Sequence, residues 1–171
     1  ATGLARPKSS AARPAITVVL QQTSDHRVAE YFRAHGFGHV HEVDDGAPFE
    51  LRGLDGSVAG TLTTAACAMG DSAFLLDLGG VRVLNTNDCG FADDVAFDDT
   101  LRMLDAESDI DLLLCQFSYA NWVGDPCDVD ERRAYARHKL DLLLRQVRRV
   151  RPRHTFPCAS FVVFAHEENL Y

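Results

Sequence analysis

Val81-Arg-Val-Leu-Asn-Thr-Asn-Asp-Cys89 begins with apolar, partly β-branched residues and continues with polar ones. This stretch predicts a β-strand that leaves the core and ends in a carboxylate, Asp88, beside a thiol, Cys89. Gly79-Gly80, just before it, accepts positive φ and predicts a tight hairpin with Phe74–Asp77. A carboxylate at the end of a buried strand needs a metal ion, an arginine or backbone N–H groups. The alternative is an Asx turn that opens the next loop.

The overall composition is that of a soluble globular chain. It has 171 residues, of which 46% are hydrophobic, which suits one domain with its own core. A net charge of −8 argues against binding to nucleic acid or to an anionic membrane surface. No apolar run approaches the roughly 20 residues that span a bilayer, so we expect no transmembrane segment. Residues 1–14, rich in small and basic side chains, are predicted to be a flexible arm or linker.

The number and spacing of the cysteines indicate the redox environment in which the chain folds. The chain has five, at positions 67, 89, 115, 127 and 158, and none forms a CxxC pair. The odd number and the spacing argue against a disulfide framework or a zinc knuckle. A reducing cytoplasm is therefore the expected location.

Local patterns predict a mixture of strands and helices. Short alternating or β-branched runs predict strands over 16–20, 39–43, 57–64, 74–84 and 110–115, and a last apolar stretch covers 156–164. Helices are predicted to begin at Asp25, at Asp93 or Asp94, and at Asp128, the last reaching Val150. Five arginines in the run 145–153 are interpreted as a solvated helix end, which favours cations. The order of the elements indicates an α/β or α+β fold.

Histidines in two places suggest metal ligands. His39 and His41 lie on one side of a predicted strand, but an exposed edge strand with two solvated histidines is the preferred interpretation. His166 follows the apolar run 161–164, so it leaves the core as Asp88 does. A carboxylate and an imidazole at strand ends can form half of a metal site. The alternative for His166 is a hydrogen-bonded histidine at the edge of the core.

Three segments together resemble a known family. They are Leu84-Asn-Thr-Asn-Asp-Cys89, Asp111-Leu-Leu-Leu-Cys-Gln-Phe-Ser-Tyr-Ala120, and Phe156-Pro-Cys-Ala-Ser-Phe161 followed by His166. In this order and spacing they look like the C-terminal half of a metallo-β-lactamase-fold protein, in the branch that contains CMP-N-acetylneuraminate hydroxylase. The resemblance begins near Ile16, so residues 15–171 are expected to be the C-terminal part of such a domain.

The resemblance implies an αββα sandwich with a metal site at one edge of its two sheets. Asp88 matches the family's bridging aspartate, and His166 matches its last histidine ligand. Cys67 falls near where relatives place another histidine, so it is a candidate thiolate ligand, with a buried structural cysteine as the alternative. The metal implied is zinc or iron, as one or two ions.

The segment Gln116–Trp122 would border the pocket for a small-molecule substrate. Its aromatic side chains, Phe117, Tyr119 and Trp122, would stack on a ring of the substrate. The alternative is that they pack into the core.

One departure from the family matters most, because the first metal motif, HxHxDH, is missing from this chain. Zinc sites use three or four protein ligands, and this chain offers two, with Cys67 as a third. We therefore expect a missing N-terminal half, or a partner chain, to complete the site. The chain is then an excerpt, a cleaved piece or a separate subunit of a larger protein.

Three functions are compatible with these expectations. The first is hydrolysis by a metal-activated water, the commoner chemistry of the fold. The second is iron-dependent oxygenation, as in the resembled branch, although the chain has no cysteine–histidine pattern for an iron–sulfur cluster. The third is a non-catalytic module that keeps the fold and binds a partner.

Overall fold

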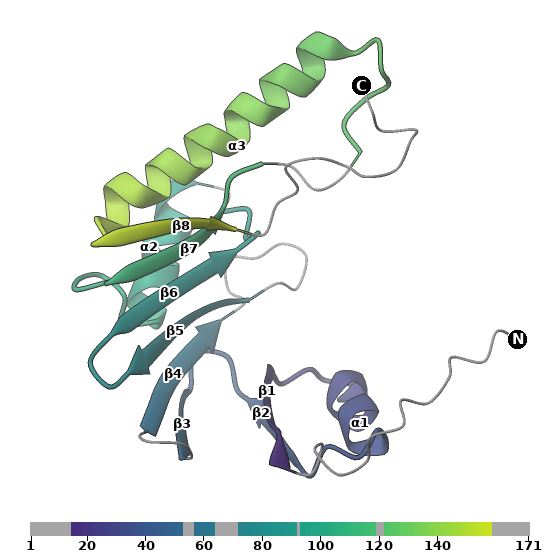
Figure 1. The fold of residues 1–171 in the computed structure, drawn as a ribbon, viewed down its shortest axis with the longest axis vertical. Helices are drawn as coiled ribbons and strands as arrows, with labels where there is room; N and C mark the ends of the chain where they lie inside the picture. The colour runs from purple at the N-terminus through teal and green to yellow at the C-terminus, as the bar shows by residue number, and fades with distance from the viewer. Residues whose placement is uncertain (1–14, 53–56, 64–71, 92, 119–121, 159–171) are drawn as a thin grey trace, which may run out of the picture. The chain divides into compact units, whose positions relative to one another are not determined.

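The computed structural model describes residues 15–52, 57–63, 72–91, 93–118 and 122–158. The chain divides into two compact units, residues 1–47 and residues 48–171 (Figure 1). Each unit is described by itself below. In the described part of the chain, no helix combines the length and the apolar character needed to cross a bilayer.

The N-terminal unit contains two parallel strands joined by a helix: β1 (Thr17–Gln21), α1 (Arg27–Ala34) and β2 (His39–Val43). The helix begins slightly later than the sequence suggested, because His26 adopts a left-handed conformation with φ of 52°. Asp25 still helps to start it, since its Oδ1 accepts a hydrogen bond from the backbone N–H of Arg27 at 3.2 Å. Glu42 of β2 accepts hydrogen bonds from Arg33 at 2.9 Å and from His26, which ties the helix to the strand.

The second unit contains one six-stranded sheet whose strand order follows the chain. The strands are β3 (Pro48–Arg52), β4 (Ser57–Thr63), β5 (Ala73–Leu78), β6 (Arg82–Asn87), β7 (Leu112–Gln116) and β8 (His154–Cys158). The first four are antiparallel, whereas β6, β7 and β8 are parallel. Parallel neighbours need long crossovers, and α2 (Asp94–Met103) and α3 (Val129–Val150) supply them. The carboxyl ends of β6, β7 and β8 therefore meet at one edge of the sheet (Figure 1).

Contacts between residues close in the sequence explain two predicted features, the hairpin between β5 and β6 and the start of α2. The hairpin between β5 and β6 turns at Gly79 and Gly80, whose φ angles are 69° and 91°. Both values lie in the left-handed region, which glycine enters without a steric cost. The second helix, α2, begins where Asp93 accepts a hydrogen bond from the backbone N–H of Ala96 at 2.9 Å. These contacts are local, so the residue pattern alone reveals them.

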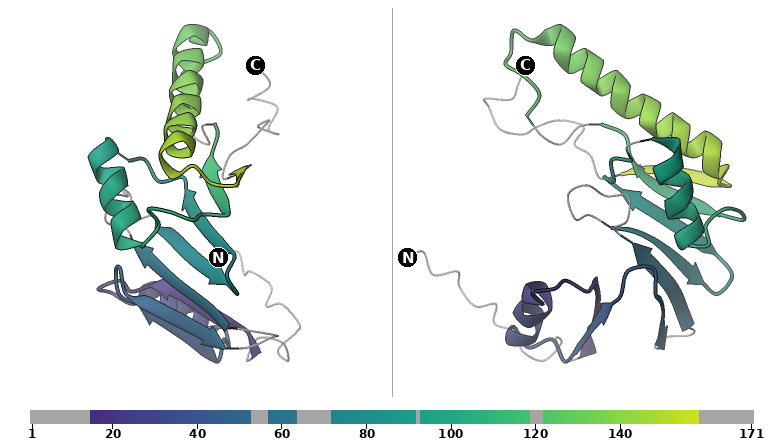
Figure 2. Two further views of the ribbon diagram at one scale, coloured as in Figure 1. Left: turned by 90° about the vertical axis from the view of Figure 1, so that its left-hand side faces the viewer. Right: turned by 180° about the vertical axis from the view of Figure 1, so that it is seen from behind.

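The core lies on the face of the sheet that α2 and α3 cover. It is a single cluster to which the strands β5, β6 and β7 and both helices contribute. Its most deeply buried large side chains are Phe97, Leu84, Leu104 and Leu113. Both helices thus pack on the same side of the sheet, as the edge-on view in Figure 2 shows for α2.

The opposite face of the sheet is also apolar, and apart from the buried Val83 the side chains named below are at least partly exposed. In β4, an added Cβ on Gly60 would lie 2.6 Å from Phe49 Cζ and 2.8 Å from Leu76 Cδ2, so these two side chains pack over the glycine. The strand register continues this face across the sheet through Phe74, Leu76, Leu112, Leu114 and Phe156. Phe156 is 61% exposed. A second layer of structure would be needed to bury this face.

Candidate functional site

The candidate site is at the edge where the parallel strands end, and its central residue is Asp88. A register shift between Asn85 and Asn87 interrupts the pairing of β6 with β7. Asn87 has a φ of 47°, and its backbone N–H donates to the side-chain oxygen of Asn85 at 2.7 Å. The chain then turns, with the N–H of Cys89 donating to the carbonyl of Thr86 at 3.0 Å. This left-handed step turns Asp88 out of the sheet, and its side chain is exposed.

Buried residues fix the turn on both sides of the exposed carboxylate. Thr86 is 1% exposed, and its hydroxyl donates to Gln146 Oε1 of α3 at 2.7 Å. Cys89 is 6% exposed and belongs to the core cluster. The amide Nδ2 of Asn87 donates to Asp88 Oδ1 at 2.6 Å, which orients the carboxylate. Asp88 is therefore held in place by neighbours whose own positions are set by packing.

Cys89 corrects one expectation from the sequence, because it is disulfide-bonded. The remaining described cysteines, Cys115, Cys127 and Cys158, are free. The odd number of cysteines made a disulfide look improbable, but an odd count excludes only complete pairing. The covalent bond reinforces the turn that carries Asp88.

Cys115 and Cys158 are poor candidates for thiolate chemistry. Burial raises the pKa of Cys115 to about 11, with a further contribution from the nearby Cys158. Burial also raises the pKa of Cys158. Both thiols stay protonated at neutral pH, and they serve as small apolar side chains between β7 and β8.

A lysine from α3 reaches the same edge. Lys139 Nζ donates to Gln116 Oε1, at the end of β7, at 2.7 Å and lies 5.9 Å from the centre of the Tyr135 ring. No carboxylate of the described residues lies within ion-pair distance of this ammonium group. The sequence reasoning missed both Lys139 and Gln146. For Gln146 a signal was available, since it interrupts the apolar face formed by Leu143, Val147 and Val150.

The other predicted site residues have different outcomes. Cys67, Tyr119 and His166 lie outside the described residues. Phe117 follows β7 directly and is half-buried, and its place beside a substrate stays a prediction. Trp122 is 72% exposed, which excludes the core-packing alternative for this side chain. Its role toward a substrate stays a prediction.

The described residues do not make a metal site by themselves. Among them, no three His, Cys, Asp or Glu side chains lie close enough to hold one ion. Asp88 has suitable chemistry, as an exposed carboxylate with no cationic partner among the described residues. His39 and His41 are both exposed on β2, as the solvated interpretation predicted. Any metal at Asp88 therefore needs ligands from elsewhere.

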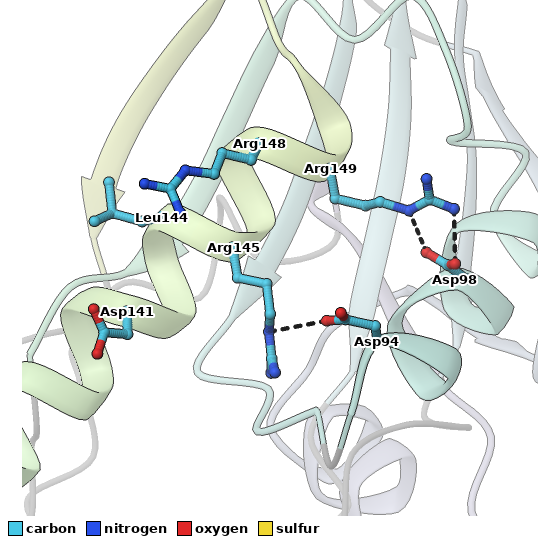
Figure 3. Close-up of a pocket in the computed structure, with 7 residues that line it drawn as sticks. All are labelled: Asp94, Asp98, Asp141, Leu144, Arg145, Arg148 and Arg149. Atoms are coloured by element: carbon cyan, nitrogen blue, oxygen red, sulfur yellow. Dashed lines mark hydrogen bonds and ion pairs between the residues drawn. The ribbon is translucent and has the colours of Figure 1, made fainter.

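The pocket that the structure shows is at a different place, between α2 and α3 (Figure 3). It has a volume of about 660 Å³ and is lined by Asp94, Asp98, Asp141, Leu144, Arg145, Arg148 and Arg149. Arg145 Nε lies 3.2 Å from Asp94 Oδ1, and Arg149 Nη2 donates to Asp98 Oδ2 at 2.7 Å. The hydrogen bond from Arg149 lowers the pKa of Asp98. These pairs join two helices, so we assign the pocket a structural role.

Four of the five arginines in the run 145–153 are exposed, as the solvated interpretation predicted, but several of them also form ion pairs that the sequence did not reveal. Arg145 and Arg149 pair with α2, and Arg153 lies 3.1 Å from Asp111 Oδ1. The carboxylates that they meet are distant in the sequence, so the helix pattern could not reveal them.

The fold, taken without the site, can be compared with solved structures. The sheet with both helices on one face and an apolar opposite face is consistent with part of a metallo-β-lactamase-like sandwich of the α+β type, the fold class that the resemblance predicted. The comparison that shows it is with a solved structure of CmlA beta-hydroxylase in a mutant form. The match has a TM-score of 0.54 at 16% sequence identity.

The match is incomplete on the side of the neighbour. It covers 84% of this chain but 31% of the CmlA chain, so the present chain spans about a third of that protein. At this identity the likeness establishes the fold alone. No family profile and no curated protein matches the sequence.

Proposed function

We propose that this chain is the C-terminal part of a metal-dependent enzyme with a metallo-β-lactamase-like fold. The observation that carries the proposal is Asp88, an exposed carboxylate with no cationic partner among the described residues. Buried neighbours hold it at the carboxyl ends of parallel strands. Binding sites of open α/β sheets form at this edge. Holding an exposed acid in a defined orientation serves a ligand, since folding alone does not require it.

In this proposal Asp88 is one metal ligand, His166 is a second and Cys67 is a candidate third. Phe117, Tyr119 and Trp122 border the substrate, a small molecule. When bound, the metal would supply either an activated water or, as iron, an oxidising centre. The chain's own described residues orient Asp88 and shape the edge around it.

The remaining ligands would come from an N-terminal half, in the same polypeptide or on a partner chain. Two observations support this expectation. Metal sites of this kind need three or four protein ligands, more than the described residues bring together. The apolar sheet face with the exposed Phe156 would also be covered by the second sheet of a complete sandwich.

Between the two reactions we favour iron-dependent oxygenation. The structural neighbour is a hydroxylase by name, and the sequence resembles the branch that contains another hydroxylase. Hydrolysis by a metal-activated water is the alternative, and the oxygen-dependence measurement described below distinguishes it from oxygenation. A non-catalytic module would keep the fold but hold no metal.

The test is metal analysis of the complete protein with the Asp88→Ala substitution. We expect the unaltered protein to contain iron or zinc and the variant to lose at least about 90% of it, since one lost ligand weakens a metal site by tenfold or more. Asp130→Ala, an exposed acid in the first turn of α3, is the matched control and should keep its metal. Equal metal content in both variants would refute the ligand assignment.

A second measurement separates the reactions. An iron-dependent oxygenase consumes oxygen with its substrate and stops under anaerobic conditions, whereas a hydrolase turns over without oxygen. A complete protein that is free of metal after growth in iron- and zinc-supplemented medium would instead support the non-catalytic module.

A further inference from the structure

The helix α3 presents a second face that is exposed to solvent. Its apolar residues Leu143, Val147 and Val150 pack against the core of the sheet. On another side, Leu140 and Leu144 are 48% and 43% exposed. These two leucines are four residues apart, so they lie next to each other on the helix surface.

Arginines extend the leucine pair in both directions. Arg133, Arg137, Leu140, Leu144 and Arg148 follow one another at intervals of three or four residues, which keeps them on one side of a helix, and all five are exposed. We call this set the α3 stripe. It runs for about 22 Å, from the rise of about 1.5 Å per residue in an α-helix.

The three arginines of the α3 stripe differ from their neighbours on the same helix. Arg145 and Arg149 reach α2 and form ion pairs with Asp94 and Asp98. By contrast, Arg133, Arg137 and Arg148 have no carboxylate partner among the residues that the structure describes. Figure 3 shows Arg148 on the same side of the helix as Leu144, away from the two ion pairs. The charge of the stripe is thus not used within the described fold.

This cationic helix belongs to an acidic chain. Its 22 residues carry seven Arg and Lys side chains and three Asp and Glu side chains, a net charge of +4. The whole chain has a net charge of −8. In Figures 1 and 2 the N-terminal half of α3 extends past the ends of the strands. A positive strip on a negative protein favours a negatively charged partner and orients its approach.

We propose that the α3 stripe is a docking surface for an acidic amphipathic helix of a partner protein. The partner helix would place apolar side chains on Leu140 and Leu144 and carboxylates beside the flanking arginines. Helices commonly bind helical surfaces through anchors spaced by three or four residues. The apolar pair would supply contact area, and the arginines would supply orientation and selectivity.

An anionic membrane is the less suitable occupant. A helix that lies on a bilayer inserts a broad apolar face, often with aromatic residues. The broad apolar face of α3 is already packed against the sheet, and two half-exposed leucines remain. The net charge of −8 on the whole chain would also oppose an anionic surface.

The test is fluorescence anisotropy with the full chain and a fluorescein-labelled synthetic peptide. The peptide carries leucines at helical three- and four-residue spacing with glutamates on both sides. A scrambled peptide of the same composition is the first control. We expect saturable binding of the patterned peptide, weaker binding at high salt, and at least about tenfold weaker binding of the scrambled peptide.

Variants locate the surface. Leu140→Ala with Leu144→Ala, and separately Arg137→Gln with Arg148→Gln, should each weaken peptide binding by about tenfold or more. Arg27→Gln with Arg102→Gln removes the same charge from two exposed arginines on other elements and should leave binding unchanged. Circular dichroism verifies that all variants remain folded.

Several outcomes would overturn the proposal: no saturable binding, equal binding of the two peptides, or binding that the stripe variants do not weaken. A fourth is tight binding of the chain to phosphatidylserine vesicles, lost in the stripe variants, without peptide binding. That result would make the stripe a membrane surface instead.

Discussion

Carboxylates occur at two places in the second unit, and the two places differ in how these acids are neutralised. In the pocket between α2 and α3, Asp94 and Asp98 each meet an arginine. At the turn after β6, the one side-chain partner of Asp88 among the described residues is the amide of its neighbour Asn87. In the pocket, Asp94 and Asp98 are therefore paired with arginines, whereas Asp88 has no ion-pair partner among the described residues. A carboxylate that lacks an ion-pair partner among the described residues and is held in place by buried neighbours indicates a ligand site more directly than the volume of a pocket does.

The two places also differ in what holds them. Covalent and buried contacts fix the turn, through the disulfide of Cys89 and the hydrogen bond of Thr86. Exposed ion pairs join the two helices at the pocket, and such pairs weaken with salt and acid. Reductant should therefore mainly destabilise the turn after β6, and low pH should mainly weaken the contact between α2 and α3.

The largest effect is expected from the disulfide. Reducing it, or the substitution Cys89→Ser, should lower the free energy of unfolding by about 2–4 kcal/mol, because the unfolded chain regains freedom. Urea denaturation with and without reductant measures this difference. Cys127→Ser, at an exposed free thiol, is the matched control and should change little.

Thiol labelling of denatured, unreduced protein tests the disulfide of Cys89 independently of its effect on stability. Alkylation without reductant should label the free thiols of Cys115, Cys127 and Cys158 but not Cys89, which should react only after reduction. Five reactive thiols without reductant would remove the covalent support of the turn from our account.

A smaller effect is expected from Thr86→Val, which is nearly isosteric but removes the hydroxyl. Gln146 Oε1 would then lose its donor while buried, at a cost of about 1–3 kcal/mol. Thr86→Ser keeps the hydroxyl and should retain most of the hydrogen-bond contribution. If thermal unfolding shows Thr86→Val to be as stable as the unaltered chain, Gln146 does not anchor the turn.

The smallest effect is expected at the pocket, and it depends on pH. Arg149 lowers the pKa of Asp98 below its ordinary value of 3.8, so the pair adds stability above that pH. The contribution disappears as pH falls through the lowered pKa, because Asp98 is then protonated in both folded and unfolded chains. Arg149→Gln should therefore be less stable than the unaltered chain at pH 7 but equal to it in strong acid. Arg148→Gln, without an ion pair, should show no such pH-dependent difference.

Local chemistry decided which parts of the fold could be predicted from sequence. The Gly79-Gly80 hairpin and the start of α2 at Asp93 depend on residues a few positions apart. The strand β3 escaped prediction because its pairing with β4 is what makes Pro48–Arg52 a strand. At α1, the contact of His26 with Glu42 on β2 accompanies the left-handed conformation of His26, and neither is visible in the sequence near Asp25.

The same limit applies to the candidate site. Asp88 was predicted because a carboxylate after a buried strand stands out in the sequence. The supporting residues Gln146 and Lys139 come from α3, far along the chain, so only the folded structure shows them beside β6 and β7. The ion pairs of Arg145 and Arg149 were missed for the same reason.

The change from antiparallel to parallel pairing at β6 also has a consequence for biosynthesis. Strands β3 to β6 pair with sequence neighbours, whereas β7 and β8 join only after the crossovers through α2 and α3. Contacts between close neighbours form quickly, and contacts that close long loops form late. As the chain leaves the ribosome, the ribbon that ends in Asp88 should therefore assemble first, with both of its apolar faces open to water. Until β8 has been synthesised and has paired with β7, we expect chaperones to bind the exposed apolar surface of this partly folded sheet.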